Sequence, residues 1–189
     1  MDILESAIKA FERMLSVKYE IILGRKGKTS VLNISFRKED FFHLAGLHYL
    51  VDVPKLKTSR DIIFDSILKK DDFRNILLSS QFIDKIERRI KYLIELEKII
   101  DSNDTVFKIY QLQFSKIKAD YILVNEIGVF KLYLFIKRLE DDNYICTFFS
   151  QNETVDYTLG QLKTTILFKK KNINSNESYV FIDKITPKN

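Results

Sequence analysis

The chain changes from helix-like to strand-like sequence in one stretch, VKYEIILGRKGKTSVLNISFR, which spans residues 17–37. Both ends of this stretch are rich in the β-branched and aromatic residues that favour strands. Its centre contains Gly27, which can adopt a positive φ at little steric cost. The pattern therefore predicts a β-hairpin with cations at its tip. Such cations are ordinary for a solvated turn, but they are also candidate phosphate contacts: Arg25, Lys26 and Lys28.

An amphipathic helix is predicted before the hairpin, over residues 2–16. Its apolar residues recur at three- and four-residue steps, so they share one face. Asp2 can act as the N-cap, and Glu5 stands three residues later, as in a capping box.

Further helices are predicted after the hairpin. Asp40 is expected to cap a short one, and the others are expected over residues 60–69, 72–78 and 80–101. The last of these has an apolar face that we expect to pack across a sheet. That face comprises Ile86, Ile90 and Leu93.

The second half of the chain is predicted to be strand-rich. The expected strands are 106–114, 119–125, 129–138, 143–149, 164–170 and 178–184. Short polar connections between them indicate an antiparallel meander. We therefore predict an α+β fold, with an N-terminal helix and hairpin, a helical middle, and a C-terminal meander forming one twisted sheet packed by helices. We expect a single domain over residues 1–189, helix-rich in 1–104 and strand-rich in 105–189.

Composition limits the partners and the cellular compartment that we expect for the protein. The 189 residues carry 31 Lys and Arg against 26 Asp and Glu, which gives a net charge of +5 and only a weak indication of a phosphate-rich partner. Cys146 is the one cysteine, so an intrachain disulfide is excluded. The N-terminus lacks the basic and apolar regions of a signal peptide, and no apolar run approaches the ~20 residues of a membrane span. We expect a cytoplasmic protein without a membrane partner.

Both histidines of the chain lie in FFHLAGLHYL, residues 41–50. The segment is mostly apolar, so it should pack against a core and hold a histidine whose ordinary pKa of ~6.5 suits proton transfer. A five-residue separation on one helix places His43 and His48 about 140° apart, at ~100° per residue. They would then not share a metal ion, and His48 would point elsewhere. Ordinary packed or surface histidines are the alternative explanation.

Most catalytic classes find no support in the sequence. It has no Gly-rich phosphate loop, no Gly-x-Ser-x-Gly elbow and no His and Cys set at metal-binding spacing. RNA cleavage through the 2′-hydroxyl remains possible, because it needs only a base, an acid and cations for the developing charge. We therefore expect no cofactor and no metal.

The segment Phe41-Phe42-His43-Leu44-Ala45-Gly46-Leu47 resembles the Phe-x-His-Leu-x-Gly region of the phage-associated barnase/EndoU/colicin/RelE-like nucleases, in their fourth phage-type subgroup. Weaker similarity extends over roughly residues 17–185. It lies in Val106–Tyr110 with Tyr121-Ile122-Leu123, in Tyr133–Lys137 followed by Tyr144, and in Ile166–Lys171. The chain departs from the family at Cys146-Thr147, where a proline is common. The resemblance implies a ribonuclease of a phage or mobile-element conflict system, such as a toxin.

The ribonuclease hypothesis assigns roles to particular side chains. His43 would be the general acid or base, with Lys55, Arg60 and Lys131 completing the catalytic set. The expected RNA-binding residues are Arg25, Lys26, Lys28, His48, Lys57, Lys137, Lys169, Lys170 and Lys171. The expected partners are RNA, with tRNA as one candidate, and a cognate immunity or antitoxin protein.

Two other functions stay open at this stage. The chain could be a catalytically inactive module of the same fold that binds RNA or a phage protein. It could also be an interaction or immunity subunit in which His43 is purely structural. Solvent access to His43, together with a nearby cation, would favour the enzyme.

Overall fold

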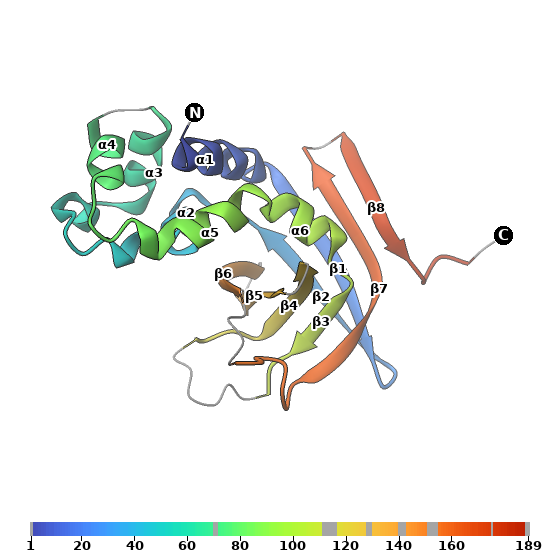
Figure 1. Ribbon diagram of the computed structural model, residues 1–189. Helices are drawn as coiled ribbons and strands as arrows, with labels where there is room; N and C mark the ends of the chain where they lie inside the picture. Colours follow the sequence, from blue (N-terminus) through green and yellow to red (C-terminus); the bar gives the residue numbers. More distant parts are fainter. Residues whose placement is uncertain are drawn as a thin grey trace. The chain divides into compact units, whose positions relative to one another are not determined.

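The computed structural model describes residues 2–69, 72–110, 117–127, 130–139, 143–150, 155–174 and 176–187. The chain is α+β, as predicted, with helices and a curled, largely antiparallel sheet (Figure 1). It divides into two compact units, Met1–Leu15 with Arg37–Glu97, and Ser16–Phe36 with Lys98–Asn189. The single domain over residues 1–189 stays a prediction. No helix within the described ranges is long and apolar enough to cross a membrane.

The first unit consists of helices. They are α1 (Ile3–Met14), α2 (Lys38–Leu44), the 3-10 turns η1 (Leu47–Tyr49) and η2 (Pro54–Lys57), α3 (Arg60–Leu68), α4 (Asp72–Leu78) and α5 (Asp84–Ile94). Three buried rings from α1, α2 and α3 meet at its centre. Their centroids lie 5.6 Å apart for Phe11 and Phe41, 5.5 Å for Phe41 and Phe64, and 6.2 Å for Phe11 and Phe64. The tilted and edge-on arrangements are those that aromatic pairs prefer.

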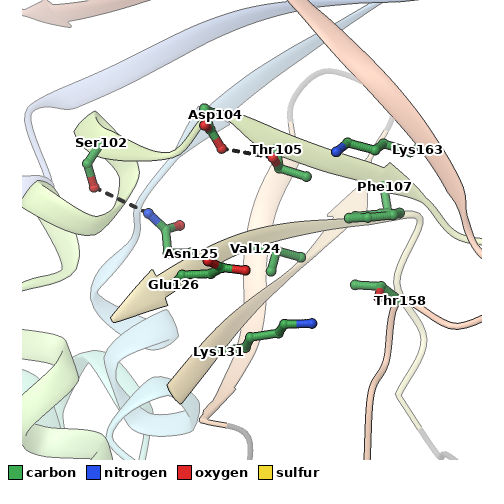
Figure 2. Close-up of a pocket in the computed structure, with 10 residues that line it drawn as sticks. All are labelled: Ser102, Asp104, Thr105, Phe107, Val124, Asn125, Glu126, Lys131, Thr158 and Lys163. Atoms are coloured by element: carbon green, nitrogen blue, oxygen red, sulfur yellow. Dashed lines mark hydrogen bonds between the residues drawn. The ribbon is translucent and has the colours of Figure 1, made fainter. Parts of the chain in front are cut away.

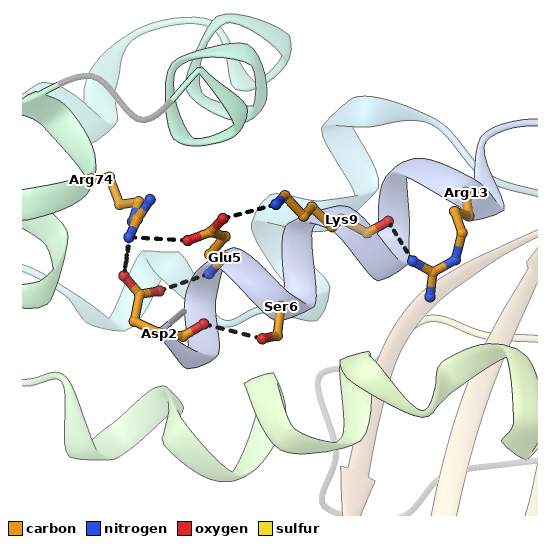
Figure 3. Close-up of polar contacts among 6 residues, drawn as sticks. All are labelled: Asp2, Glu5, Ser6, Lys9, Arg13 and Arg74. Atoms are coloured by element: carbon orange, nitrogen blue, oxygen red, sulfur yellow. Dashed lines mark hydrogen bonds and ion pairs between the residues drawn. The ribbon is translucent and has the colours of Figure 1, made fainter.

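The start of α1 is held by the predicted N-cap. The Asp2 carboxylate accepts a 2.8 Å hydrogen bond from the Glu5 amide (Figure 3). The Glu5 carboxylate accepts from Lys9 Nζ at 2.8 Å, and the Arg74 guanidinium of α4 pairs with Asp2 and with Glu5. Because Glu5 is buried, these cations supply the partners that a buried carboxylate needs. They also tie α4 to the first turn of α1.

Two predicted helices differ in their bounds. The helix expected over 80–101 is divided at Glu95 into α5 and α6 (Leu96–Ser102), because the backbone there leaves the helical region at φ −97° and ψ 7°. α5 buries Ile86, Ile90 and Leu93 and packs against α1; their packing across the sheet stays a prediction. α2 begins after Arg37, so Asp40 lies inside it, accepting the Arg37 backbone N–H at 2.8 Å.

The second unit consists of α6 after Glu97 and an eight-stranded sheet. The strands are β1 (Val17–Arg25), β2 (Lys28–Ser35), β3 (Thr105–Lys108), β4 (Tyr121–Ile127), β5 (Phe130–Arg138), β6 (Asn143–Ser150), β7 (Leu162–Ile173) and β8 (Glu177–Asp183). Their order is β1-β2-β6-β5-β4-β3-β7-β8, and β1 also pairs with β7. The predicted meander therefore runs from β3 to β6, whereas the long strand β7 returns beside both β3 and β1.

The predicted hairpin is formed by β1 and β2. Arg25 pairs with Lys28 at the end of the ladder. The two residues between them, Lys26 and Gly27, have φ of 48° and 73°. Positive φ at both central positions is the turn geometry that matches the twist of a two-stranded ribbon. The three cations thus lie at the tip, as expected.

The basic run Lys169-Lys170-Lys171, which was expected to bind RNA, lies inside β7. Lys169 is 1% exposed, and its amine donates to the backbone carbonyls of Ile100, Asp101 and Asn103 at 2.9, 2.6 and 2.5 Å. Lys171 is also buried and bonds the Asp101 carboxylate at 2.9 Å. The expected RNA contacts of Lys169 and Lys171 are thus replaced by contacts to the end of α6.

We predict that Lys169→Met lowers the free energy of unfolding by about 3 kcal/mol, because the substitution removes the three hydrogen bonds that the buried amine donates to carbonyls at the end of α6. Chemical denaturation at pH 7 measures this. Lys170→Met is the matched control on the same strand, and its half-buried side chain should change stability by less than about 0.5 kcal/mol. Equal losses in the two variants would show that the amine contacts do not stabilise the fold.

Candidate active site

A sharp reversal after α2 brings the two histidines together. α2 ends at Leu44, and Gly46 adopts a left-handed conformation at φ 77°, after which η1 carries His48. The Gly46 amide donates to the His43 carbonyl at 3.1 Å and closes the turn. The imidazole centroids are 5.6 Å apart. The expectation that His48 points elsewhere is therefore wrong, because it assumed one continuous helix.

Aromatic rings surround the two imidazoles. Phe42 lies edge-on to His43 at 5.6 Å, and Tyr49 lies 4.1 Å from His48. Phe42 is buried, His43 is half-buried, and His48 and Tyr49 are exposed. The imidazoles are thus held by packing on one side and open to solvent on the other.

Two arginines contact the aromatic rings that pack beside the imidazoles. The Arg60 guanidinium lies 5.3 Å from the Phe42 centroid, and the Arg89 guanidinium lies 5.3 Å from that of Tyr49. Arg89 also hydrogen-bonds the Tyr49 side chain. A Cβ added at Gly46 would lie 2.8 Å from Arg89 Cδ, so glycine is needed here for space as well as for φ. Sequence reasoning missed Arg89 and Tyr49, since Arg89 reaches the site from α5.

This environment lowers the pKa of both histidines. For His43 the main cause is desolvation, followed by the positive charge of Arg60, while Asp40 opposes the shift. For His48 the causes are desolvation, then His43, Arg89 and Arg60. Desolvation also lowers the pKa of Arg89, which stays charged at neutral pH.

The arrangement offers two proton-transfer groups beside two cations. Among the described residues, no side chain hydrogen-bonds either imidazole, so the ring nitrogens can serve a ligand. Nor does any set of three His, Cys, Asp or Glu side chains in the described part of the chain have the placement to hold a metal ion. A base, an acid and delocalised positive charge can together promote displacement at a phosphate.

The other predicted site residues have different surroundings. Lys57 is exposed at the end of η2, and the side chain of Lys55 lies outside the described residues. Lys137 is half-buried on β5, and the amine of Lys131 pairs with the Asp156 carboxylate at 3.3 Å. Lys131 and Lys137 belong to the second unit, so their roles beside His43 stay predictions.

Lys131 lines a pocket of about 530 Å³ in the second unit (Figure 2). Its charged lining is balanced, with Lys131 and Lys163 against Asp104 and Glu126. Asn125, which also lines it, donates to the Ile99 carbonyl at 2.8 Å and is buried. The pocket thus has no excess of positive charge that would favour a phosphate.

We predict that both histidines titrate below the ordinary value of about 6.5. Because the chain has two histidines, NMR titration of their Cε1 protons, assigned with His43→Gln and His48→Gln, measures each pKa directly. Just below pH 6.5 the unfolded chain then binds more protons than the folded one, so stability falls as the pH drops. A variant in which both histidines are changed to Gln should not show this part of the loss of stability at lower pH. Midpoints above 6.5 would contradict the packing and charge argument.

Comparison with known proteins identifies the family. Neither the curated proteins nor the solved structures gave a match. A protein-family comparison matched residues 2–185, which include the whole histidine site. The chain therefore belongs to the family described as phage-Barnase-EndoU-ColicinE5/D-RelE like nuclease4, which confirms the resemblance seen in the His43 segment.

Proposed function

We propose that the protein is a metal-independent ribonuclease that cleaves RNA through the 2′-hydroxyl. The family description supports a nuclease. The observation that carries the ribonuclease proposal is the meeting of both histidines, 5.6 Å apart, beside Arg60 and Arg89. Such a set supplies proton transfer and charge stabilisation without a protein nucleophile.

The reaction is an internal displacement at phosphorus. One histidine, neutral, takes the proton of the 2′-hydroxyl while its oxygen forms a bond to the adjacent phosphorus. The bond from phosphorus to the 5′-oxygen breaks, and the other histidine, protonated, gives that oxygen its proton. The products are a 2′,3′-cyclic phosphate and a 5′-hydroxyl. We assign no fixed order to His43 and His48, since either can be the base.

The arginines have separate roles in this proposal. Arg60 is exposed, and it lowers the pKa of His43, so its charge acts at the imidazoles. We assign it to the developing negative charge on the phosphate oxygens. Arg89 is half-buried and held by Tyr49, which makes it a positioning residue for the turn that carries His48.

We also propose a biological setting for this activity. A phage-type nuclease would act as a toxin in a conflict system of a phage or mobile element, with cellular RNA as substrate and tRNA as one candidate. A cognate immunity or antitoxin protein would then protect the producing cell.

We predict that His43→Gln and His48→Gln each reduce RNA cleavage by about 10²–10⁴-fold, because glutamine keeps the packing volume but cannot exchange a proton near pH 7. Total RNA and tRNA, incubated in EDTA, serve as substrates, and thermal melting shows whether each variant folds. An oligonucleotide with a single 2′-deoxy residue at a mapped cleavage site should resist the enzyme there.

Several outcomes would overturn this proposal. They are cleavage that survives in folded His43→Gln, cleavage that needs a divalent metal, and cleavage at the 2′-deoxy site. Failure of the unmodified chain to cut any of these RNAs, with RNA binding intact, would favour the catalytically inactive module. If both Gln variants unfold, Asn at the same positions provides a smaller replacement for the same test.

We predict that cleavage is fastest below pH 6.5, since one histidine must be protonated and both pKa values are lowered. Arg60→Gln removes a positive charge that lowers both, so it should slow the reaction and also move the kcat/KM optimum to higher pH. Arg13→Gln, on the exposed part of α1, is the charge-matched control and should leave the profile unchanged. A slower Arg60→Gln enzyme with an unmoved optimum would show that Arg60 does not act on the histidines.

A further inference from the structure

The tip of the β1–β2 hairpin borders a second hollow, of about 380 Å³. Four cations line it, namely Arg25, Lys26, Lys28 and Lys108. Thr29 and Ser30 add hydroxyls, and none of the described lining residues is acidic or aromatic. No ion pair joins any of the four cations to a carboxylate within the described part of the chain.

Lys108 shows that this is more than a solvated turn. It lies at the end of β3, about eighty residues beyond the hairpin, opposite Leu162 of β7. Gly24 of β1 pairs with Thr165 of the same strand β7. The sheet therefore brings the cation of a distant strand to the same hollow as those of the tip.

The electrostatics of this hollow favour an anion. Four like charges around one small space repel each other, and a bound anion relieves that repulsion. The pocket of Figure 2 differs, since its lining combines two lysines with two carboxylates. The absence of aromatic side chains from the described lining removes base stacking, so recognition falls to the phosphates and hydroxyls.

We infer that the hollow at the hairpin tip binds the backbone phosphates of RNA, independently of sequence. The choice of RNA rests on the proposed function, whereas the anion site rests on the four cations. Backbone contacts of this kind hold and orient a strand without reading its bases. The second unit would thus carry a substrate-binding region of its own, besides the proton-transfer residues of the first.

The test measures RNA binding in a His43→Gln background, so that cleavage does not interfere. Labelled single-stranded RNAs of two unrelated sequences are titrated from 50 to 200 mM salt (about the range over which such contacts weaken). Changing Arg25, Lys26, Lys28 and Lys108 together to Gln should flatten the salt slope by up to ~3, at about 0.7 per phosphate contact. Both sequences should lose affinity equally.

A matched variant controls for net charge. It changes Lys69, Lys85, Lys98 and Lys184 to Gln, all exposed and outside the hollow, and should alter the slope much less. The single variant Lys108→Gln distinguishes binding in the hollow from binding at the turn alone. It should flatten the salt slope by about 0.7. Equal losses in the two quadruple variants, or no effect of Lys108→Gln in a folded chain, would overturn the inference.

Two further measurements show whether the bound phosphate belongs to the RNA backbone, to a 5′-end or to free phosphate. RNAs with a 5′-hydroxyl and a 5′-phosphate should bind equally, and inorganic phosphate should compete only weakly. Strong preference for the 5′-phosphate would overturn the assignment to the strand backbone. If the tip variant shows a flatter salt slope but the unmodified chain cuts no RNA, only the ribonuclease proposal is overturned. If the salt slope of the tip variant is unchanged and the unmodified chain cleaves RNA, only this inference is overturned.

Discussion

The second unit depends on a lysine ammonium in place of a helix cap. The last carbonyls of a helix have no intrahelical donor, and α6 ends against the sheet, where water is excluded. Lys169 Nζ donates N–H groups to the carbonyls of Ile100 and Asp101 in the last turn and to that of Asn103 just after the helix. Burial lowers the pKa of Lys169 to about 8, so the group is still mostly charged at pH 7. The Asp101 carboxylate, bonded by Lys171 and the Tyr19 hydroxyl, extends this connection to β1.

The first unit depends on a backbone constraint. The chain must reverse at Gly46 for His48 to reach His43, and the positive φ there disfavours any residue with a Cβ. The same position leaves room for Arg89, which contacts Tyr49 from α5. One glycine thus determines both the approach of the two imidazoles and the access of a cation.

The periodic parts of the fold could be predicted from the sequence, and the site could be predicted only in part. The bounds of α1, α3, α4 and most strands follow from local spacing, capping and turn residues. Lys169 shows where such reasoning fails. Three adjacent lysines are typical of an exposed surface, and the sequence alone does not show that the end of α6 requires N–H donors at this place. The prediction for His48 was wrong for a similar reason, since the direction of the chain after Gly46 depends on tertiary packing. Arg89 and Lys108 gave no local signal, because each reaches its cluster from an element distant in sequence.

In the proposed ribonuclease, the charges around the histidines would connect substrate binding to proton transfer. In the free protein, desolvation and the arginines favour neutral imidazoles. A phosphate bound at Arg60 would offset the guanidinium charge and place negative charge beside the rings, and both effects raise a histidine pKa. Substrate would then help to protonate the histidine that serves as the acid, while the neutral partner remains the base. Because the two imidazoles are 5.6 Å apart, the first proton taken up opposes the second. The proximity of the rings thus disfavours the doubly protonated pair and a bound phosphate would disfavour the neutral pair, which leaves the singly protonated pair that the proposed chemistry needs.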